Sequence, residues 1–287
     1  MTNGAATNGG AAGPRPSTVF FLSDYGLRDE FVGVVHAVLR RLVPGAVVVD
    51  LTHDVPPFDV RAGSEALLRA VPFLGSGVVL GVVDPGVGAG RRGLAIEAGT
   101  LWFVGPDNGL LVPAAEAAGE LHHVVELDVG PDVSPTFDGR DVFAPAVAAL
   151  CDGTPCEQLG AAVPVAELVR VPRPVCERGR TSDGRRTLRA EVTWVDRFGN
   201  VQLAASATAL PEDVPVLTAT AEPVPGKAVA GWGGTEIVSR VRAFGDLGPG
   251  EVGVLVDANR RLALVVREGS AALRLGVGTG DLVTLSW

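Results

Sequence analysis

Three aspartates in the first half of the chain follow short apolar runs, where parallel strands would end. They are Asp24, Asp54 and Asp84. In open α/β sheets, ligands bind at the carboxyl ends of the strands. A single aspartate in such a position is about as often a helix cap or a turn former. Three at one edge favour a binding site with negative charge.

A glycine-rich segment that contains Arg91 and Arg92 follows Asp84. Its residues 88–93 match the pattern GxGxxG. A dinucleotide fingerprint must open a helix, however, and the apolar residues 93–98 predict a strand instead. We therefore expect a tight loop here. One of the two arginines is expected to pair with the Asp84 carboxylate, and the alternative is a solvated arginine pair.

Two further clusters combine acidic and aromatic side chains. The first is Phe137 with Asp138, just before an alanine-rich helical segment; the second is Asp196, Phe198 and Asn200, at a break between strands. Phe137 alone is typical of a core residue, and the second cluster alone is typical of a turn with a β-bulge. An ordinary turn does not need Asp, Phe and Asn together, which makes both clusters candidate parts of a site.

The elements that must position these residues fall into two classes. Up to residue 172, apolar runs alternate with helical patterns such as Phe31–Leu42. This order predicts an α/β domain with a largely parallel sheet. A hairpin is expected at Gly99-Thr100.

The second half lacks helical periodicity and carries short apolar runs separated by Gly and Pro. Residues 187–287 are therefore expected to form a small all-β, barrel-like domain, with a sandwich as the alternative. The polar residues 173–186 are expected to be a linker or exposed loop. The Gly-, Ala- and Asn-rich residues 1–17 are expected to be a disordered tail without the pattern of a secretory signal.

Composition excludes several function classes. The chain has 287 residues, a formal charge of −9, three cysteines and four histidines. The negative charge argues against a nucleic-acid partner, and the apolar runs are too short for a membrane span. Neither disulfides nor a metal site is expected from so few unpaired cysteines and histidines. The cytoplasm is the expected location, and the amino-acid usage is typical of a GC-rich bacterium.

Six collinear segments resemble one family, the S-adenosylmethionine (SAM) hydroxide adenosyltransferases, in the superfamily that also holds the fluorinases and chlorinases. The resemblance covers residues 18–287. The segments are Phe21-Leu22-Ser23-Asp24-Tyr25-Gly26, Asp84-Pro85-Gly86-Val87-Gly88, Gly105-Pro106-Asp107-Asn108-Gly109-Leu110-Leu111, Pro135-Thr136-Phe137 with Gly139-Arg140-Asp141, Val195-Asp196 with Phe198-Gly199-Asn200, and Gly269-Ser270-Ala271-Ala272.

The resemblance implies an α/β domain followed by a β-barrel domain, in a homotrimer whose sites lie between subunits. It also implies attack at C5′ of SAM, without a cofactor, and displacement of methionine. In the family pattern, Asp24 takes the ribose hydroxyls, aromatic residues pack against the nucleoside and Asp196 holds the ammonium group. The substrate-binding residues implied in this way are Asp24, Phe58, Asn108, Phe137, Asp196, Phe198, Asn200, Ala258, Asn259, Arg267 and Glu268.

The implied catalytic residues are Asp84, Arg91 and Asp138, with water as the nucleophile. Halogenating members carry an aromatic residue where this chain has Asp84, and a carboxylate there repels halide and can orient water. The hydrolases carry His where this chain has Asp138. Two carboxylates beside one arginine can share a proton. The alternatives are halide-using adenosyl transfer and a non-catalytic protein that binds adenosine or SAM.

Overall fold

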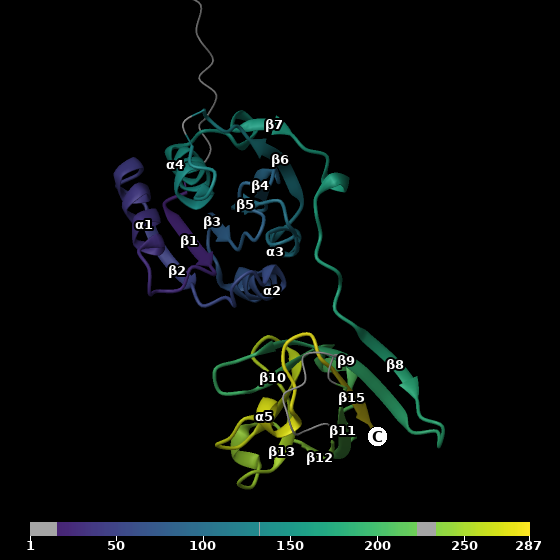
Figure 1. The fold of residues 1–287 in the computed structure, drawn as a ribbon. Helices are drawn as coiled ribbons and strands as arrows, with labels where there is room; N and C mark the ends of the chain where they lie inside the picture. The colour runs from purple at the N-terminus through teal and green to yellow at the C-terminus, as the bar shows by residue number, and fades with distance from the viewer. Residues whose placement is uncertain (1–15, 132, 223–233) are drawn as a thin grey trace, which may run out of the picture. The chain divides into compact units, whose positions relative to one another are not determined.

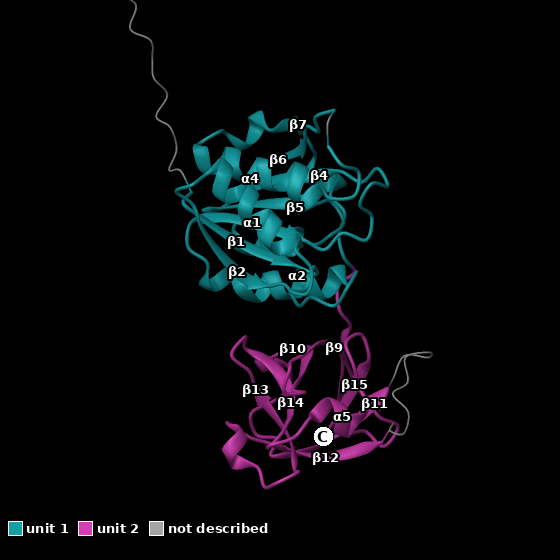
Figure 2. Ribbon diagram, turned by 60° about the vertical axis from the view of Figure 1, so that its left-hand side comes forward, with its two compact units in different colours: residues 1–171 teal, residues 172–287 magenta. Residues whose placement is uncertain are grey.

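The computed structural model describes residues 16–131, 133–222 and 234–287. The chain divides into two compact units, residues 1–171 and 172–287, as Figure 2 shows in two colours. The expected disordered tail, residues 1–17, lies almost wholly outside the described residues. In the part of the chain that is described, no helix combines the length and apolar character needed to cross a membrane.

The first unit is built on a seven-stranded sheet with the order β2-β1-β3-β5-β4-β6-β7. The strands β2, β1, β3 and β5 are parallel to one another, and β4, β6 and β7 add antiparallel pairs at one side. The α/β class with a largely parallel sheet is thus confirmed, as is the hairpin between β4 and β5. The strands are β1 (Thr18–Ser23), β2 (Val47–Thr52), β3 (Gly77–Val82), β4 (Gly93–Ala98), β5 (Leu101–Pro106), β6 (Leu121–Leu127) and β7 (Gly160–Ala162).

Helices cover both faces of this sheet. Figure 1 shows α1 beside α4 on one face and α2 beside α3 on the other. Helix α1 buries one stripe of apolar side chains, whereas the alanine-rich α4 is buried on most sides and ends at Gly153 in the left-handed region. The α-helices are α1 (Phe31–Leu42), α2 (Val60–Ala70), α3 (Val112–Ala118) and α4 (Ala144–Asp152), and a π-helical turn, η2 (Gly139–Phe143), leads directly into α4.

The second unit is a closed barrel. Its strands follow the order β10-β14-β13-β12-β11-β15-β9, and a pairing of β10 with β9 closes the ring, while β8 extends the sheet from β9. Side chains alternate in burial along β11, so that Leu217, Ala219 and Ala221 point into the core. The strands are β8 (Cys176–Arg180), β9 (Arg186–Val195), β10 (Val201–Ser206), β11 (Val216–Glu222), β12 (Thr235–Arg240), β13 (Val252–Val256), β14 (Arg261–Val266) and β15 (Leu282–Ser286), with one short helix, α5 (Ala271–Leu275).

The barrel expectation is confirmed, but the expectation of a loop over residues 173–186 is wrong in part. This segment contains β8, which pairs with β9 along its whole length. All five residues of β8 are exposed, so the strand carries no apolar pattern that sequence reasoning could detect. Short 3₁₀ turns complete the fold: η1 (Val71–Phe73), η3 (Cys156–Gln158), η4 (Val165–Glu167), η5 (Ala207–Ala209) and η6 (Phe244–Asp246).

Candidate functional site

A pocket of about 250 Å³ lies in the first unit, at the carboxyl ends of β1 and β3. These strands are parallel neighbours, so their ends bring Asp24 and Asp84 to one edge of the sheet. The loop before α2 and the residues around the start of η2 supply further walls. The lining residues are Asp24, Tyr25, Phe31, Pro57, Phe58, Val82, Asp84, Val87, Thr136, Phe137, Asp138 and Gly139.

One arginine bridges two carboxylates of this pocket. The Nε of Arg91 lies 3.0 Å from each carboxylate oxygen of Asp84, and its Nη2 donates to both Asp84 and Asp138. All three side chains are largely buried, with 7% of Asp84, 15% of Arg91 and 17% of Asp138 exposed. The expected pairing of an arginine with Asp84 is therefore confirmed for Arg91. Arg92 pairs instead with Asp107 and Glu167.

The surroundings of Arg91 favour its charged form. Burial works to lower the pKa of the Arg91 guanidinium, but the hydrogen bonds and negative charges of Asp84 and Asp138 outweigh it and raise the pKa above its ordinary value. The guanidinium also lies over the ring of Phe143, 5.1 Å from its centroid. Arg91 therefore stays a cation and holds the two carboxylates side by side.

Asp24 faces the same pocket under a different constraint. Its Oδ2 accepts a 2.9 Å hydrogen bond from the backbone N–H of Phe58. Burial raises the pKa of the Asp24 carboxyl, the bond from Phe58 opposes that effect, and the charge of Asp84 adds to it. The other carboxylate oxygen of Asp24 has lone pairs that can accept a hydroxyl hydrogen from a ligand.

The loop that reaches Asp24 is strained at Phe58. Phe58 has a φ of 69°, which is rare for a residue other than glycine, and its side chain is 72% exposed. The next residue, Asp59, caps α2 by accepting a hydrogen bond from the N–H of Ala62. The cap and the bond to Asp24 hold Phe58 in this conformation, with its ring presented at the pocket.

Three aromatic rings form another wall. The ring centroids of Tyr25, Phe31 and Phe137 lie 5.3 to 5.8 Å apart, at angles between tilted and edge-to-face. Burial, together with the charges of Asp24, Asp84 and Asp138, raises the pKa of the Tyr25 hydroxyl, which stays protonated. Tyr25, Phe31 and Thr136 were not singled out from the sequence, although Tyr25 and Thr136 lie within the quoted motifs.

Gly139 permits this arrangement. A Cβ at position 139 would lie 2.2 Å from the Tyr25 hydroxyl oxygen, so no other residue fits beside the tyrosine without movement. The π-helical turn η2 begins at this residue, and such turns recur at functional sites. Asp138 immediately precedes this turn, which leads into the largely buried helix α4.

Two residues expected at this site do not line the pocket. The Asn108 amide donates to the carbonyl of Val83, and its oxygen accepts from the N–H of Leu110. Asn108 thus fixes the strand end next to Asp84 and does not line the pocket. Asp54 follows β2 on the same edge, but it is also not among the lining residues.

The second unit has its own groove, of about 590 Å³, lined by Phe198, Asn200, Phe244, Gly245, Val266, Arg267, Glu268 and Gly269. Four residues singled out from the sequence line it together: Phe198, Asn200, Arg267 and Glu268. Phe198 is 71% exposed at the tip of a turn. Ala258 and Asn259 lie in the turn between β13 and β14, outside the lining of this groove.

The turn beside this groove is held by Asp196. Its Oδ1 accepts from the N–H groups of Phe198 and Asn200, and its Oδ2 accepts from the Asn200 side-chain amide. Gly199 has a φ of 82°, and a Cβ there would lie 2.0 Å from the Ser270 Oγ. The two motifs around residues 199 and 270 are therefore in direct contact. The carboxylate of Asp196 is already used within the turn.

Comparison with known proteins identifies relatives over nearly the whole chain. The profile of the SAM hydroxide adenosyltransferase N-terminal domain matches residues 19–160, and that of the C-terminal domain matches residues 190–284. A protein of Salinispora tropica named (R)-S-adenosyl-L-methionine hydrolase is 46% identical over 92% of this chain and 95% of its own length. A fluorinase of Actinoplanes sp. is 27% identical over 64% of this chain and 70% of its own.

A solved structure has a similar fold. The crystal structure of an uncharacterized conserved protein from Thermotoga maritima aligns with a TM-score of 0.80 and 33% sequence identity. The alignment covers 93% of this chain and 99% of the other.

Proposed function

Because this chain belongs to the SAM hydroxide adenosyltransferase family, we propose that the pocket of its first unit is the place where SAM reacts. The protein is an enzyme, a SAM hydrolase. Water or hydroxide attacks C5′ of the substrate, and the products are adenosine and L-methionine. The observation that carries the assignment of the site is the bridge of Arg91 to Asp84 and Asp138 in the pocket.

The chemistry makes modest demands on the protein. The leaving group departs from a sulfonium as a neutral thioether, so it needs no general acid and no cofactor. The protein must hold water in line with the bond that breaks, which is worth about 7–11 kcal/mol in favourable cases. It must also orient the water or take its proton.

Asp84 is the proposed group that orients the water and takes its proton. Its carboxylate lines the pocket, and Arg91 fixes its plane through two contacts from Nε. Asp138, in the position where the family's hydrolases carry His, completes the trio and supplies a second acceptor. Two carboxylates also repel halide ions, which favours water as the nucleophile.

The remaining roles concern substrate binding. Asp24 would accept hydrogen bonds from the ribose hydroxyls, and Phe58 and Phe137 would pack against the nucleoside. Phe198, Asn200, Arg267 and Glu268 would contact the adenosine part, and Ala258 and Asn259 the methionine carboxylate. Asp196 would hold the ammonium group through Oδ2, which accepts one hydrogen bond within the turn whereas Oδ1 accepts two.

The proposal includes a homotrimer and a cytoplasmic location. The trimer follows from the family pattern, in which residues from both domain types build each site. Sedimentation of the full chain tests it through the molecular mass. The location is supported by the three cysteines, which are free thiols.

Product analysis tests the proposed reaction directly. Purified enzyme is incubated with SAM in ¹⁸O-labelled water, the products are separated by chromatography, and their masses are measured by mass spectrometry. We expect adenosine and methionine in equal amounts, with the label in the 5′-hydroxyl. A parallel incubation with chloride that yields a 5′-chloro-nucleoside would reassign the nucleophile, and recovery of unreacted, tightly bound SAM would favour a binding protein.

Asp84→Asn tests the assignment of the site, with Asp54→Asn as its matched control on the same sheet edge. We expect the first change to lower kcat by about 10²–10⁴-fold, the usual contribution of a general base, and the second to leave it unchanged. Equal activity in the two variants would overturn the role of Asp84 while leaving the reaction itself in place.

A further inference from the structure

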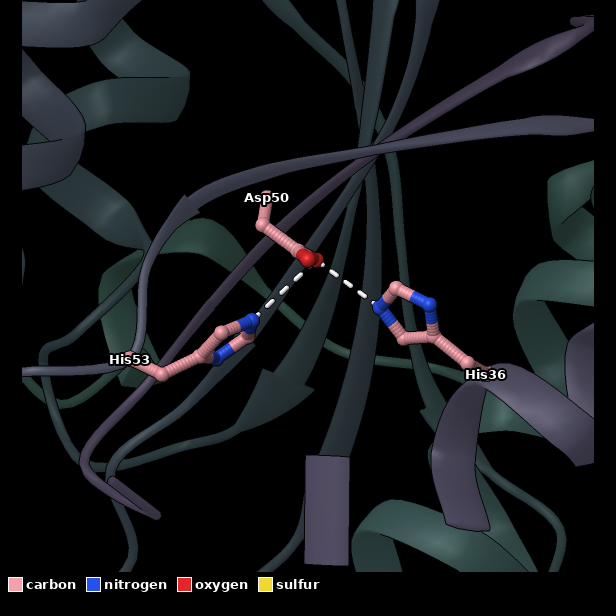
Figure 3. A group of neighbouring side chains, drawn as sticks. All are labelled: His36, Asp50 and His53. Atoms are coloured by element: carbon pink, nitrogen blue, oxygen red, sulfur yellow. Dashed lines mark hydrogen bonds and ion pairs between the residues drawn. The ribbon is translucent and has the colours of Figure 1, made fainter. Parts of the chain in front are cut away.

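Three side chains of the first unit converge on the edge strand of its sheet, apart from the pocket. His36 comes from α1, Asp50 from β2 and His53 from the loop that follows β2. Figure 3 shows both imidazole rings turning a nitrogen toward the Asp50 carboxylate. The Nε2 of His36 lies 2.8 Å from the Asp50 Oδ1, and the Nε2 of His53 lies 3.1 Å from the same oxygen.

We propose that His36, Asp50 and His53 form a binding site for a divalent transition-metal ion of the zinc class. Two imidazole nitrogens and one carboxylate are a ligand set that such ions prefer. The three donor atoms lie within 4.8 Å of one another. Tetrahedral coordination with metal–ligand bonds of about 2.0–2.2 Å places neighbouring ligand atoms about 3.4 Å apart. The two histidine nitrogens lie 2.8 and 3.1 Å from the Asp50 oxygen, so small side-chain movements would admit an ion.

The buried imidazole of His53 supports this inference independently. Its side chain is only 3% exposed, and within the described residues its Nε2 makes no hydrogen bond of acceptable geometry. Its contact with the Asp50 Oδ1, at 3.1 Å, is an ion pair. A buried nitrogen without a hydrogen bond is costly, and coordination of an ion at Nε2 would satisfy it.

The other ring nitrogen of His53 is arranged as metal sites require. Its Nδ1 lies 2.8 Å from the Ser23 Oγ. When Nδ1–H donates to this hydroxyl, the lone pair of Nε2 faces Asp50 and His36. An outer hydrogen bond of this kind fixes the tautomer and the ring orientation of a metal-binding histidine.

The surroundings hold the ligands in place. The buried ring of Phe21 packs against both imidazoles, with centroids 6.0 Å from His36 and 4.6 Å from His53. Phe21 also pairs with Asp50 in the register of β1 and β2. Because 42% of Asp50 and 35% of His36 are exposed, an ion can enter and water can complete its coordination.

The proposed metal site is separate from the proposed SAM pocket, but it contacts the loop that carries Asp24. The backbone N–H of Gly26 donates to the carbonyl of His53, and Ser23 immediately precedes Asp24. A bound ion would therefore stiffen the loop that carries Asp24. The inference itself does not rest on the proposed function, since its test reads metal content and not turnover.

Equilibrium dialysis of the full chain, untagged, reduced and first stripped with a chelator, tests the proposal with Zn²⁺ and with Co²⁺ as a visible probe. We expect one equivalent of Zn²⁺ per chain and cobalt d–d absorption. His36→Ala and Asp50→Asn should each weaken binding at least about tenfold, which is the smallest loss seen even for outer-sphere changes. These residues are half-exposed, so both variants should fold.

Two matched controls separate this site from other ligands. His123→Ala removes the imidazole of the second group that could hold an ion, Glu97, His123 and Glu157, and Cys176→Ser removes the exposed thiol. Both should bind Zn²⁺ as the unchanged protein does. Absence of stoichiometric binding, equal binding in His36→Ala, or loss of binding in either control would overturn the proposal. Zn²⁺ should also raise the melting temperature of the unchanged protein but not that of His36→Ala.

Discussion

The Nε of Arg91 lies 3.0 Å from both carboxylate oxygens of Asp84. The same guanidinium reaches Asp138 through Nη2, so one cation holds two acids together in the pocket. Without Arg91, the two negative charges would repel each other and separate. The proposed catalytic arrangement thus depends on the planar, multi-donor shape of arginine and not on its charge alone.

Arg91→Lys tests this dependence. Lysine keeps the charge but has no planar fork, and its single ammonium cannot reproduce the side-on contact with Asp84. We expect kcat for SAM hydrolysis to fall at least about hundredfold, with a smaller change in KM. Arg170→Lys, in an exposed pair with Glu116, is the control and should keep its activity. Full activity in Arg91→Lys would mean that a point charge suffices.

Asp138→Asn and Asp138→His together test the acid in the position of the family's histidine. Asn removes the charge and should lower kcat by about 10²-fold. His should retain hydrolysis and add an acidic limb to the kcat–pH profile near its ordinary pKa of about 6.5, because only the neutral ring accepts a proton. If Asp138→Asn is as active as the unchanged enzyme, Asp138 has no part in water activation.

Asp24→Asn should stabilise the folded protein and weaken its binding of SAM. Burial raises the pKa of this carboxyl, so its ionised form destabilises the folded state. At pH values below the ordinary pKa of 3.8, Asp24 is protonated in both the folded and the unfolded state, so this penalty is absent. At pH values above the raised folded-state pKa, the penalty is fully present. We therefore expect Asn to raise the melting temperature at neutral pH, with a smaller gain toward pH 4, and to weaken SAM binding. A lower melting temperature at pH 7 would contradict this reasoning.

Gly139→Ala should disturb the pocket through Tyr25, because the added Cβ would lie 2.2 Å from the tyrosine oxygen. Overpacking of this kind costs about 1–3 kcal/mol of unfolding free energy. Thermal unfolding and KM for SAM measure the effect. The double variant with Tyr25→Phe should recover most of the loss, since the next ring atom lies 3.3 Å away. Failure of that rescue would place the strain elsewhere.

Phe198→Ala should weaken substrate binding without affecting stability. The ring is 71% exposed, so its removal leaves no cavity in the barrel. Loss of an aromatic contact of about 0.5–1.5 kcal/mol predicts a KM that is about twofold to tenfold higher, with kcat and melting temperature unchanged. Ile237→Ala, 72% exposed on β12, is the control and should leave KM as it is. An unchanged KM in Phe198→Ala would remove this residue from the site.

The sequence by itself determined the elements and the acids that they carry. Apolar runs and helical periodicity gave the α/β domain and the barrel because burial imposes a pattern on the residues of each element. The aspartates at the ends of β1 and β3 followed from the geometry of parallel strands. The strand β8 was not predicted, because all its residues are exposed and it therefore has no apolar pattern.

Only the tertiary structure decided which side chains meet. Asp138 lies 47 positions from Arg91, and His36 lies 14 positions from Asp50, so neither contact leaves a local pattern. The pairing of Arg92 with Asp107 and the use of Asn108 to fix the backbone of Val83 likewise came from packing. Local periodicity reports the face that an element buries, whereas partners across elements are set by how the faces dock, which a single chain does not encode at any fixed spacing.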